Sequence, residues 1–163
     1  MYKKIKEILS YILIIIIVLL IKQFIITPIR VNGTSMNDTL KHQDIMILDR
    51  ISYRFSKIKR FDIVVVKRDG EYLIKRVIGL PGDMIEYKNN KLYVNEKEIK
   101  EDFKHKKTDD FKLDIKIPDD YYFVMGDNRP DSIDSRIIGL INKDEILGKT
   151  SLVIFPFKRI GIK

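Results

Sequence analysis

A serine and a lysine are the residues of this chain whose types and settings best suit catalysis. Ser35 follows Gly33 in a loop, where a hydroxyl can be exposed and backbone N–H groups can face a negatively charged oxygen. Lys75 lies between Ile74 and Arg76 in an apolar run that predicts a β-strand. Side chains alternate between the two faces of a strand, so Lys75 and Arg76 point in opposite directions. Either Lys75 faces the core as a buried amine, or it faces solvent and Arg76 lies inward.

A buried lysine would supply a general base. Burial disfavours the ammonium form and can lower a lysine pKa by roughly 3–5 units from about 10.4. A neutral amine beside a serine hydroxyl can take its proton, which makes the serine a nucleophile. The setting of Lys75 therefore decides whether a Ser/Lys pair can operate.

A third polar segment could orient that amine. Gly126 opens a turn-rich stretch, and Ser132, Asp134 and Arg136 follow at alternate positions. In an extended chain these three side chains share one side, where a hydroxyl, a carboxylate and a guanidinium can form a network that orients a neighbouring group. The alternative is a solvated polar loop.

Composition excludes several other chemistries. The chain has no cysteine, which rules out disulfides, thiolate metal sites and a cysteine nucleophile. It has two histidines, His42 and His105, and no HExxH pattern, so a metal site or a Ser-His-Asp triad has little support. We predict no metal and no cofactor. The net charge of +8 is spread along the chain without a nucleic-acid-binding signature, so we predict a membrane partner and no nucleic acid.

The front of the chain predicts a membrane anchor. Residues 8–26 are mostly apolar, and a helix of that length rises about 28 Å, close to the thickness of the hydrocarbon layer. Three lysines at residues 3, 4 and 6 precede the span, which places the N-terminus in the cytoplasm. We expect residues 1–27 to form a cytoplasmic tip and a single transmembrane helix. The alternative is a cleavable signal peptide, but the residues after the span contain no small-x-small cleavage site.

The remainder, residues 28–163, predicts an extracytoplasmic β domain. Six short apolar runs read as strands, at residues 45–48, 62–66, 72–78, 91–94, 121–125 and 152–155. Turn signals lie between them at 69–70, 81–83, 89–90 and 95–97, and Asn142 is placed to cap a short helical turn over 142–147. The polar residues 87–116 are expected to form a peripheral insertion. The fold class is mainly β, with a strongly bent antiparallel sheet system or partial barrel behind one N-terminal transmembrane helix.

The C-terminal end leaves two interpretations open. Phe155 and Phe157 are followed by Lys158 and Arg159, a mixture suited to a surface that dips into lipid headgroups. Alternatively, the two phenylalanines close the core of the last strand.

Four segments in this order resemble type I signal peptidases. The chain has S-M-N-D-T-L at 35–40, F-D-I-V-V at 61–65, K-R-V-I-G-L-P-G-D at 75–83 and G-D-N-R-P-D-S-I-D-S-R at 126–136. The resemblance runs from the anchor to about residue 140. It implies a membrane-anchored serine endopeptidase that removes N-terminal signal peptides from exported preproteins, with small residues at the −1 and −3 positions of the substrate.

The resemblance also assigns roles. It implies that Ser35 is the nucleophile that forms an acyl-enzyme, and that Lys75 is the general base. The supporting residues are Ser132, Asp134, Arg136 and Arg76. The residues of the substrate pocket are Val31, Met36, Leu40 and Ile74. Stabilisation of the substrate oxyanion is assigned to the Ser35 backbone N–H and the Gly33 region.

Four positions depart from the family pattern. Asp38 replaces the usual proline, and Thr34 stands where glycine is common, directly before the nucleophile. Gly33 stands where some relatives have a serine that donates to the oxyanion, so this chain depends on backbone N–H groups there. Phe61 replaces a common glycine, with less consequence.

Two other functions compete with this one. One is a membrane-tethered binding module, which would have no need of a buried amine at Lys75. The other is a self-cleaving, repressor-type Ser/Lys peptidase, which would carry a DNA-binding domain in place of the apolar front end.

Overall fold

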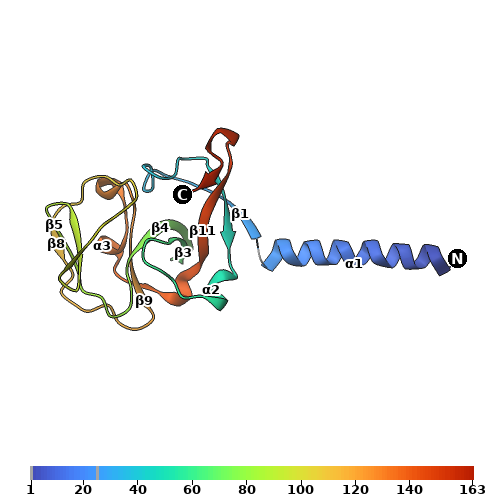
Figure 1. Ribbon diagram of the computed structural model, residues 1–163, viewed down its shortest axis with the longest axis horizontal. Helices are drawn as coiled ribbons and strands as arrows, with labels where there is room; N and C mark the ends of the chain where they lie inside the picture. Colours follow the sequence, from blue (N-terminus) through green and yellow to red (C-terminus); the bar gives the residue numbers. More distant parts are fainter. Residues whose placement is uncertain (1, 25) are drawn as a thin grey trace.

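The computed structural model describes the backbone of residues 2–24 and 26–163, and the side chains of residues 4–18 and 27–163. Helix α1 (Tyr2–Phe24) forms the front of the chain and projects from the β-rich remainder (Figure 1). Within the described residues, no helix combines the length and hydropathy that a bilayer crossing requires. The predicted apolar span at 8–26 extends beyond the described side chains, so the anchor stays a prediction.

Two antiparallel sheets build the rest, which confirms the mainly β prediction. In the described part of the chain the larger sheet has eight strands. Its spatial order is β1 (Ile26–Arg30), β2 (Ile45–Asp49), β11 (Ile146–Phe155), β3 (Ile63–Arg68), β4 (Glu71–Gly79), β9 (Tyr121–Met125) and β10 (Ile141–Asn142), and β12 (Gly161–Ile162) pairs with β11. The smaller sheet has the order β7 (Lys97–Ile99), β6 (Lys91–Val94), β5 (Ile85–Lys88) and β8 (Phe111–Lys112).

The hairpin turns form where the sequence predicts them. Asp69 and Gly70 join β3 to β4 with φ values of 50° and 83°, and Asn89 and Asn90 join β5 to β6 with φ values of 52° and 64°. Glycine and asparagine tolerate this left-handed region, and paired positive φ values match the twist of a hairpin. Strand β11 shifts register against β2 and β3, and such bulges bend a sheet.

Short helices complete the fold. They are α2 (Ser52–Phe55), α3 (Ser135–Ile138) and the 3-10 helices η1 (Arg129–Asp131), η2 (Lys143–Glu145) and η3 (Phe157–Arg159). The predicted cap is confirmed: the Asn142 side chain accepts from the Asp144 N–H at 2.9 Å, and the Glu145 carboxylate accepts from the Asn142 N–H at 2.7 Å.

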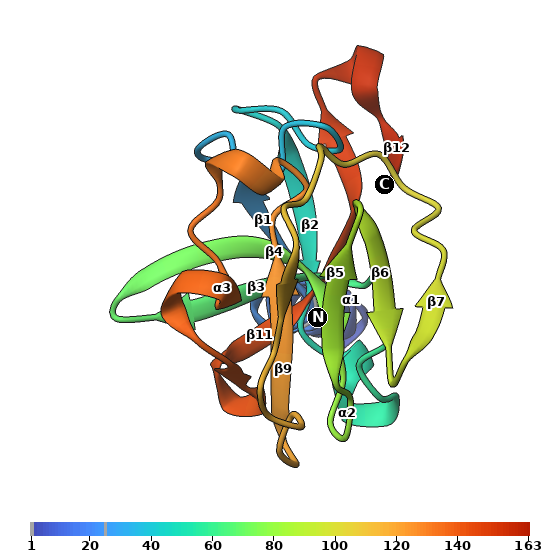
Figure 2. The same ribbon diagram turned by 90° about the vertical axis from the view of Figure 1, so that its left-hand side faces the viewer.

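Among the described residues the core has three apolar clusters. One of them packs between the two sheets, whose arrangement is seen in Figure 2. Its buried members are Ile78, Ile85, Tyr87, Leu92, Val94, Ile117, Phe123 and Met125. Tyr87, Leu92 and Val94 belong to the polar interval 87–116. That interval is therefore packed against β4 and β9 through an apolar face, and most of its charged residues lie outward, with the side chain of Glu101 as a buried exception.

Candidate active site

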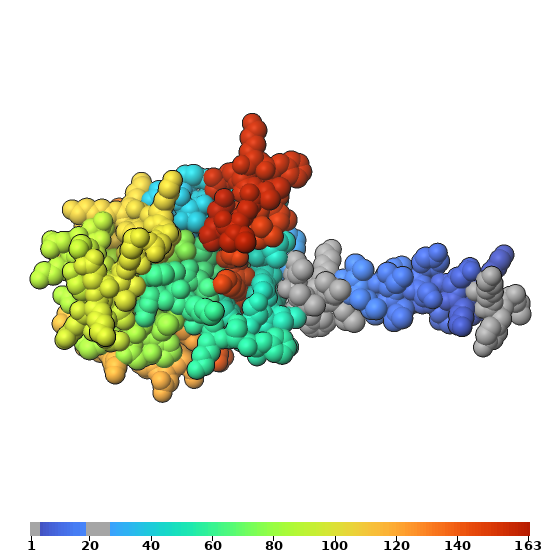
Figure 3. Space-filling view, in the orientation of Figure 1, coloured from blue at the N-terminus to red at the C-terminus, as the bar shows by residue number. Residues whose placement is uncertain are grey.

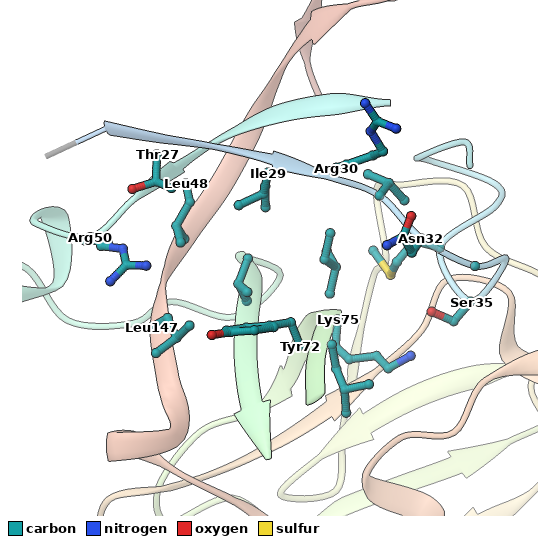
Figure 4. Close-up of a pocket in the computed structure, with 16 residues that line it drawn as sticks. Thr27, Ile29, Arg30, Asn32, Ser35, Leu48, Arg50, Tyr72, Lys75 and Leu147 are labelled. Atoms are coloured by element: carbon teal, nitrogen blue, oxygen red, sulfur yellow. The ribbon is translucent and has the colours of Figure 1, made fainter. Parts of the chain in front are cut away.

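A cavity of about 440 Å³ lies between β1 and β4, and both Ser35 and Lys75 line it (Figure 4). Apolar side chains dominate its wall. The lining residues are Thr27, Ile29, Arg30, Val31, Asn32, Gly33, Ser35, Met36, Leu48, Arg50, Val65, Tyr72, Leu73, Ile74, Lys75 and Leu147. Of the predicted pocket residues, Val31, Met36 and Ile74 line the cavity. Leu40 does not: it is buried in the cluster beneath, with Val31 and Met36.

The loop that carries Ser35 is fixed by backbone hydrogen bonds. The Val31 N–H donates to the Asp44 carbonyl at 2.8 Å, which ties the start of the loop to its return. The Asn128 N–H donates to the Ser35 carbonyl at 2.9 Å, which ties the loop to the segment after β9. The tight turn over 35–39 forms with Asp38 in place of proline. Ser35 therefore has a defined position at one end of the cavity.

Thr34 has a specific partner, which accounts for its departure from glycine. Its hydroxyl donates to the Asp131 carboxylate at 2.7 Å, and its carbonyl accepts from the Asn128 side-chain amide at 3.1 Å. The same amide also donates to Asp131 at 3.3 Å. These contacts clamp the residue before Ser35 onto the segment that follows β9.

The two predicted oxyanion donors differ in availability. The Gly33 N–H donates to His42 Nδ1 at 3.3 Å, with Gly33 at a φ of 94°. In the described part of the chain the Ser35 N–H donates to no group. The Ser35 N–H is thus the backbone donor left to face a substrate oxygen.

Lys75 is a buried amine. It lies on β4 with 3% of its surface exposed, and its Nζ donates to Ser132 Oγ at 3.3 Å. Burial lowers the pKa of Lys75 from 10.5 to about 8, although the nearby Asp134 carboxylate acts in the opposite direction. No hydrogen bond joins Lys75 to the Ser35 hydroxyl among the described residues. Catalytic hydrogen bonds are often long without substrate.

Arg76 is buried as well, so β4 has no solvent-facing side at this point. Its guanidinium pairs with Asp127 at 2.7 and 2.9 Å and donates to the Phe61 carbonyl at 3.0 Å. It also lies over the Phe103 ring, 4.0 Å from the centroid. Strand alternation allowed burial of either Lys75 or Arg76. The structure buries both, because Lys75 packs beside Ser132 on one face of β4 and Arg76 packs against Asp127 and Phe103 on the other.

The segment after β9 gathers Ser132, Asp134 and Arg136 around Lys75. Arg136 binds both Asp134 carboxylate oxygens at 2.8 Å, and the Gly126 N–H donates to the same carboxylate at 3.0 Å. Burial of Asp134 opposes ionisation, but the hydrogen bonds from Arg136 and Gly126 outweigh it and hold the pKa of Asp134 below its usual value. The solvated-loop alternative is wrong for this segment, since Ser132 and Asp134 are buried.

Gly126 permits the close packing that joins these parts. A Cβ at this position would overlap the Ser132 hydroxyl and the Ser35 carbonyl. Only glycine lets the Ser35 loop and the Ser132 segment approach this closely.

Sequence reasoning missed several contacts of the site. Asp127 and Asp131 lay inside a motif that we had singled out, but their partners are 51 and 97 residues away. The contact of His42 with Gly33 gave no signal, because it depends on how the loop folds back. Arg50 and Tyr72 gave no signal, since only the folded chain brings them to the cavity.

Comparisons with known proteins agree with this architecture. A family model described as "Signal peptidase, peptidase S26" matches residues 4–155. A signal peptidase I of Bacillus amyloliquefaciens is 39% identical over 162 residues, which cover 93% of this chain and 88% of that protein. Signal peptidase IB of Staphylococcus aureus is 38% identical over 176 residues, covering 93% of this chain and 92% of that protein.

A solved structure is also similar. The crystal structure of a signal peptidase I from Enterococcus faecalis has 36% sequence identity and a TM-score of 0.53, and the match covers 58% of this chain and 97% of that one. The family model and the relatives each span most of the chain. The chain therefore belongs to the signal peptidase family, peptidase S26, a family of serine endopeptidases whose name implies the removal of signal peptides.

Proposed function

We propose that this chain is a membrane-anchored signal peptidase that cleaves exported preproteins with a Ser35/Lys75 dyad. One observation carries the proposal: a buried lysine amine, with a pKa of about 8, lies at the same end of an apolar cavity as a loop serine. Burial of an unpaired cation is unfavourable, so a lysine in this setting suits proton transfer better than structural support.

The dyad works through one covalent intermediate. The neutral Lys75 amine takes the Ser35 proton as Ser35 Oγ attacks the scissile carbonyl carbon, and the Ser35 N–H donates to the oxyanion. The Lys75 ammonium then gives its proton to the leaving amine, and an acyl ester remains on Ser35. Water attacks this ester as Lys75 accepts a proton from the water. The Lys75 ammonium then gives that proton to Ser35 Oγ as the ester bond breaks, which restores Ser35 and the neutral amine and releases the signal peptide with a carboxyl group that ionises in solution.

Neighbouring residues hold the amine in place. Ser132 Oγ lies 3.3 Å from Lys75 Nζ and restricts where the amine points. The Asp134–Arg136 pair fixes the backbone around Ser132, and the Arg76–Asp127 pair fixes β4 from its other face. A group positioned in this way meets the geometric demand of proton transfer.

The substrate is a signal peptide with small residues at −1 and −3. The apolar wall formed by Val31, Met36 and Ile74 supports an apolar segment of substrate next to the cut. A wall of bulky apolar side chains close to Ser35 favours short substrate side chains. The preference itself comes from the family resemblance.

The chain is anchored once in the cell membrane, with residues 1–27 as cytoplasmic tip and anchor. Residues 28–163 form the catalytic domain outside, with the interval 87–116 as its added polar segment. Ser35 lies nine residue steps after Ile26, a reach of at most about 30 Å. The nucleophile therefore stays close to the outer face of the bilayer, where signal peptides emerge.

Cleavage of a purified preprotein tests the proposal. Ser35→Ala and Lys75→Ala should each abolish cleavage, because each removes one half of the proton transfer. The matched controls are Ser56→Ala and Lys88→Ala, which change exposed residues away from the cavity. Acid-quenched wild-type enzyme should carry the acyl group on the peptide that contains Ser35, detected by mass spectrometry. Substantial activity in either dyad variant would refute the assignment.

A further inference from the structure

The end of the cavity farthest from Ser35 has a different chemistry from the rest. Figure 4 shows Arg50, Thr27 and Leu147 at this end, with Tyr72 between them and Lys75. Apolar side chains line the stretch in between. The cavity therefore connects two polar ends through an apolar middle.

This far end lies where the chain leaves helix α1. In the β1–β2 register, Ile26 pairs with Asp49, the residue before Arg50. Ile26 follows the last residue of α1, Phe24, by two positions, a span of about 7 Å at most. Strand β1 then runs along the cavity towards Ser35. The cavity therefore extends from near the end of helix α1 to Ser35.

The backbone of Arg50 is held in place, but the charge of its side chain has no partner among the described residues. The neighbouring Asp49 carboxylate accepts from the Ile51 and Ser52 N–H groups, both at 2.9 Å, which locks the turn. Gly148 packs so tightly on this turn that a Cβ would overlap the Asp49 carbonyl. Among the described residues, Arg50 is exposed and its side chain has no ion pair or hydrogen bond.

The charged residues that line the cavity are all basic. The lining includes Arg30, Arg50 and Lys75 but no aspartate or glutamate. A basic wall of this kind favours a ligand that presents hydrogen-bond-accepting oxygens to Arg50. In a peptide without acidic side chains, the groups of this kind are backbone carbonyls.

We propose that Arg50 binds the C-terminal end of the apolar helix of the signal peptide, upstream of the cut. This inference rests on the proposed function. A signal peptide has a basic start followed by an apolar stretch of about 7–15 residues, so it crosses in the same direction as α1 and its C-terminal end faces the cavity entrance. The last four carbonyls of a helix lack partners and form the negative end of its dipole.

The dimensions suit this binding mode. The β1 side of the cavity runs from Thr27 to Gly33, six steps along an extended chain, or about 20 Å. An extended substrate of about the same number of residues reaches from the scissile bond to Arg50. The helix of the signal peptide therefore ends at Arg50, and the residues after it lie extended in the apolar part of the cavity.

The test compares two substrates in full-length enzyme with phosphatidylcholine vesicles. One is a preprotein with its apolar helix and no acidic residue in the ten positions before the cut. The other is a short peptide with three residues before the cut and two after it. Arg50→Met should lower kcat/KM for the preprotein by about two- to five-fold, the range for a cation at a helix C-terminus, and leave the short peptide unchanged. Arg50→Lys keeps the charge and should stay near wild type. Arg54→Met, which changes an exposed arginine of α2 outside the cavity wall, is the control.

Other outcomes overturn the proposal. An equal loss with both substrates would mean that Arg50 only supports the fold, and no loss with either would mean that the far end is unused. An effect that appears only in phosphatidylglycerol vesicles, for both substrates, would assign Arg50 to lipid phosphate. Failure of the proposed function is seen separately, as preprotein cleavage that is absent in wild type or retained in Ser35→Ala.

Discussion

Lys75 determines the pH range in which the proposed chemistry operates. Burial lowers its pKa to about 8, and only the neutral amine can accept the Ser35 proton. With the short peptide substrate, kcat/KM should rise about tenfold per pH unit below pH 8 and level off above it. A full pH–rate profile between pH 6 and 10 measures this. A flat profile over that range would contradict a lysine base.

The same burial makes Lys75 a destabilising residue in the folded state. Its pKa is about 8 when folded against an ordinary value of 10.5, so the unfolded chain binds more protons between these values and the free energy of unfolding rises with pH there. At neutral pH the difference corresponds to about 3 kcal/mol.

Lys75→Met should therefore raise the free energy of unfolding at pH 7, by up to about 3 kcal/mol less the lost hydrogen bond to Ser132. The same variant should be inactive. Urea unfolding at pH 7 and pH 10 measures the change, and the gain over wild type should be smaller at pH 10. A variant less stable than wild type at pH 7 would show that the amine contributes packing or hydrogen bonding that outweighs its desolvation.

For single residues, the sequence identified the candidates for the site but not how deeply each is buried or what it contacts. Ser35, Lys75 and Ser132 could be singled out from motifs, and the structure brings them to one place. The burial of Lys75 could not be decided, because strand alternation allows either face to be inward. The clamp on Thr34 could not be foreseen either, since Asp131 reaches it only through the close approach at Gly126.

Among the elements, strands with a continuous apolar run were predictable, and strands with an interrupted pattern or only two residues were not. Strands β6 and β9 match their predicted residues, and β2 differs at one end by one residue. The prediction at 152–155 found only the end of β11, because Gly148 and Lys149 interrupt its apolar pattern. Strand β1 contains Pro28 and follows helix α1 almost directly, so no change in the apolar pattern marked where the helix ends and the strand begins. Two-residue strands such as β10 are too short to show a sequence pattern, and they form only because a neighbouring strand pairs with them.

The small sheet is joined to the catalytic segment by one buried arginine. Arg129 donates to Glu101 at 2.6 Å, to the Tyr87 hydroxyl at 2.8 Å and to the Gly126 carbonyl at 3.1 Å, and only 1% of its surface is exposed. Glu101 and Tyr87 belong to the interval 87–116. This interval therefore supports the segment that carries Ser132.

Glu101→Gln should destabilise the protein by about 3 kcal/mol, because it leaves a buried guanidinium without its counter-charge. Loss of this support should also lower kcat more than it changes KM. The control is Glu98→Gln, which breaks the Lys91–Glu98 pair on the same sheet, where both side chains are about half exposed, and should cost less than about 1 kcal/mol. Urea unfolding and steady-state kinetics compare the two. Equal effects would show that Arg129 does not depend on Glu101.

At the scale of the whole molecule, the C-terminal end of the chain, red in Figure 3, carries exposed apolar side chains. Phe157 is 78% exposed and Ile162 is 81% exposed, and Phe155 meets Phe157 edge to face at 5.5 Å. The interpretation that both phenylalanines close the core is therefore wrong. Arg159 is not free to meet headgroups, because it pairs with the buried Asp44 at 2.9 Å. The exposed cations of this end are Lys158 and Lys163.

These exposed groups predict a second membrane contact besides the proposed anchor. A chain that begins at residue 26 keeps all of β1, whereas a cut at residue 28 removes two of its pairs with β2. This anchorless chain should co-sediment with phosphatidylglycerol vesicles, since aromatic and aliphatic side chains flanked by lysine bind at the interface. Replacing Phe157 and Ile162 together with serine should release it.

Ile115→Ser is the matched control for that release, because Ile115 is 53% exposed but belongs to the polar interval of the small sheet. Without the proposed anchor, this weaker contact alone holds the domain at the bilayer, so the anchorless chain should cleave short soluble peptides better than vesicle-inserted preproteins. If the anchorless chain stays in the supernatant with both neutral and anionic vesicles, the C-terminal end has no affinity for lipid. The reach from Ile26 to Ser35 would then be the only constraint that keeps the nucleophile near the membrane.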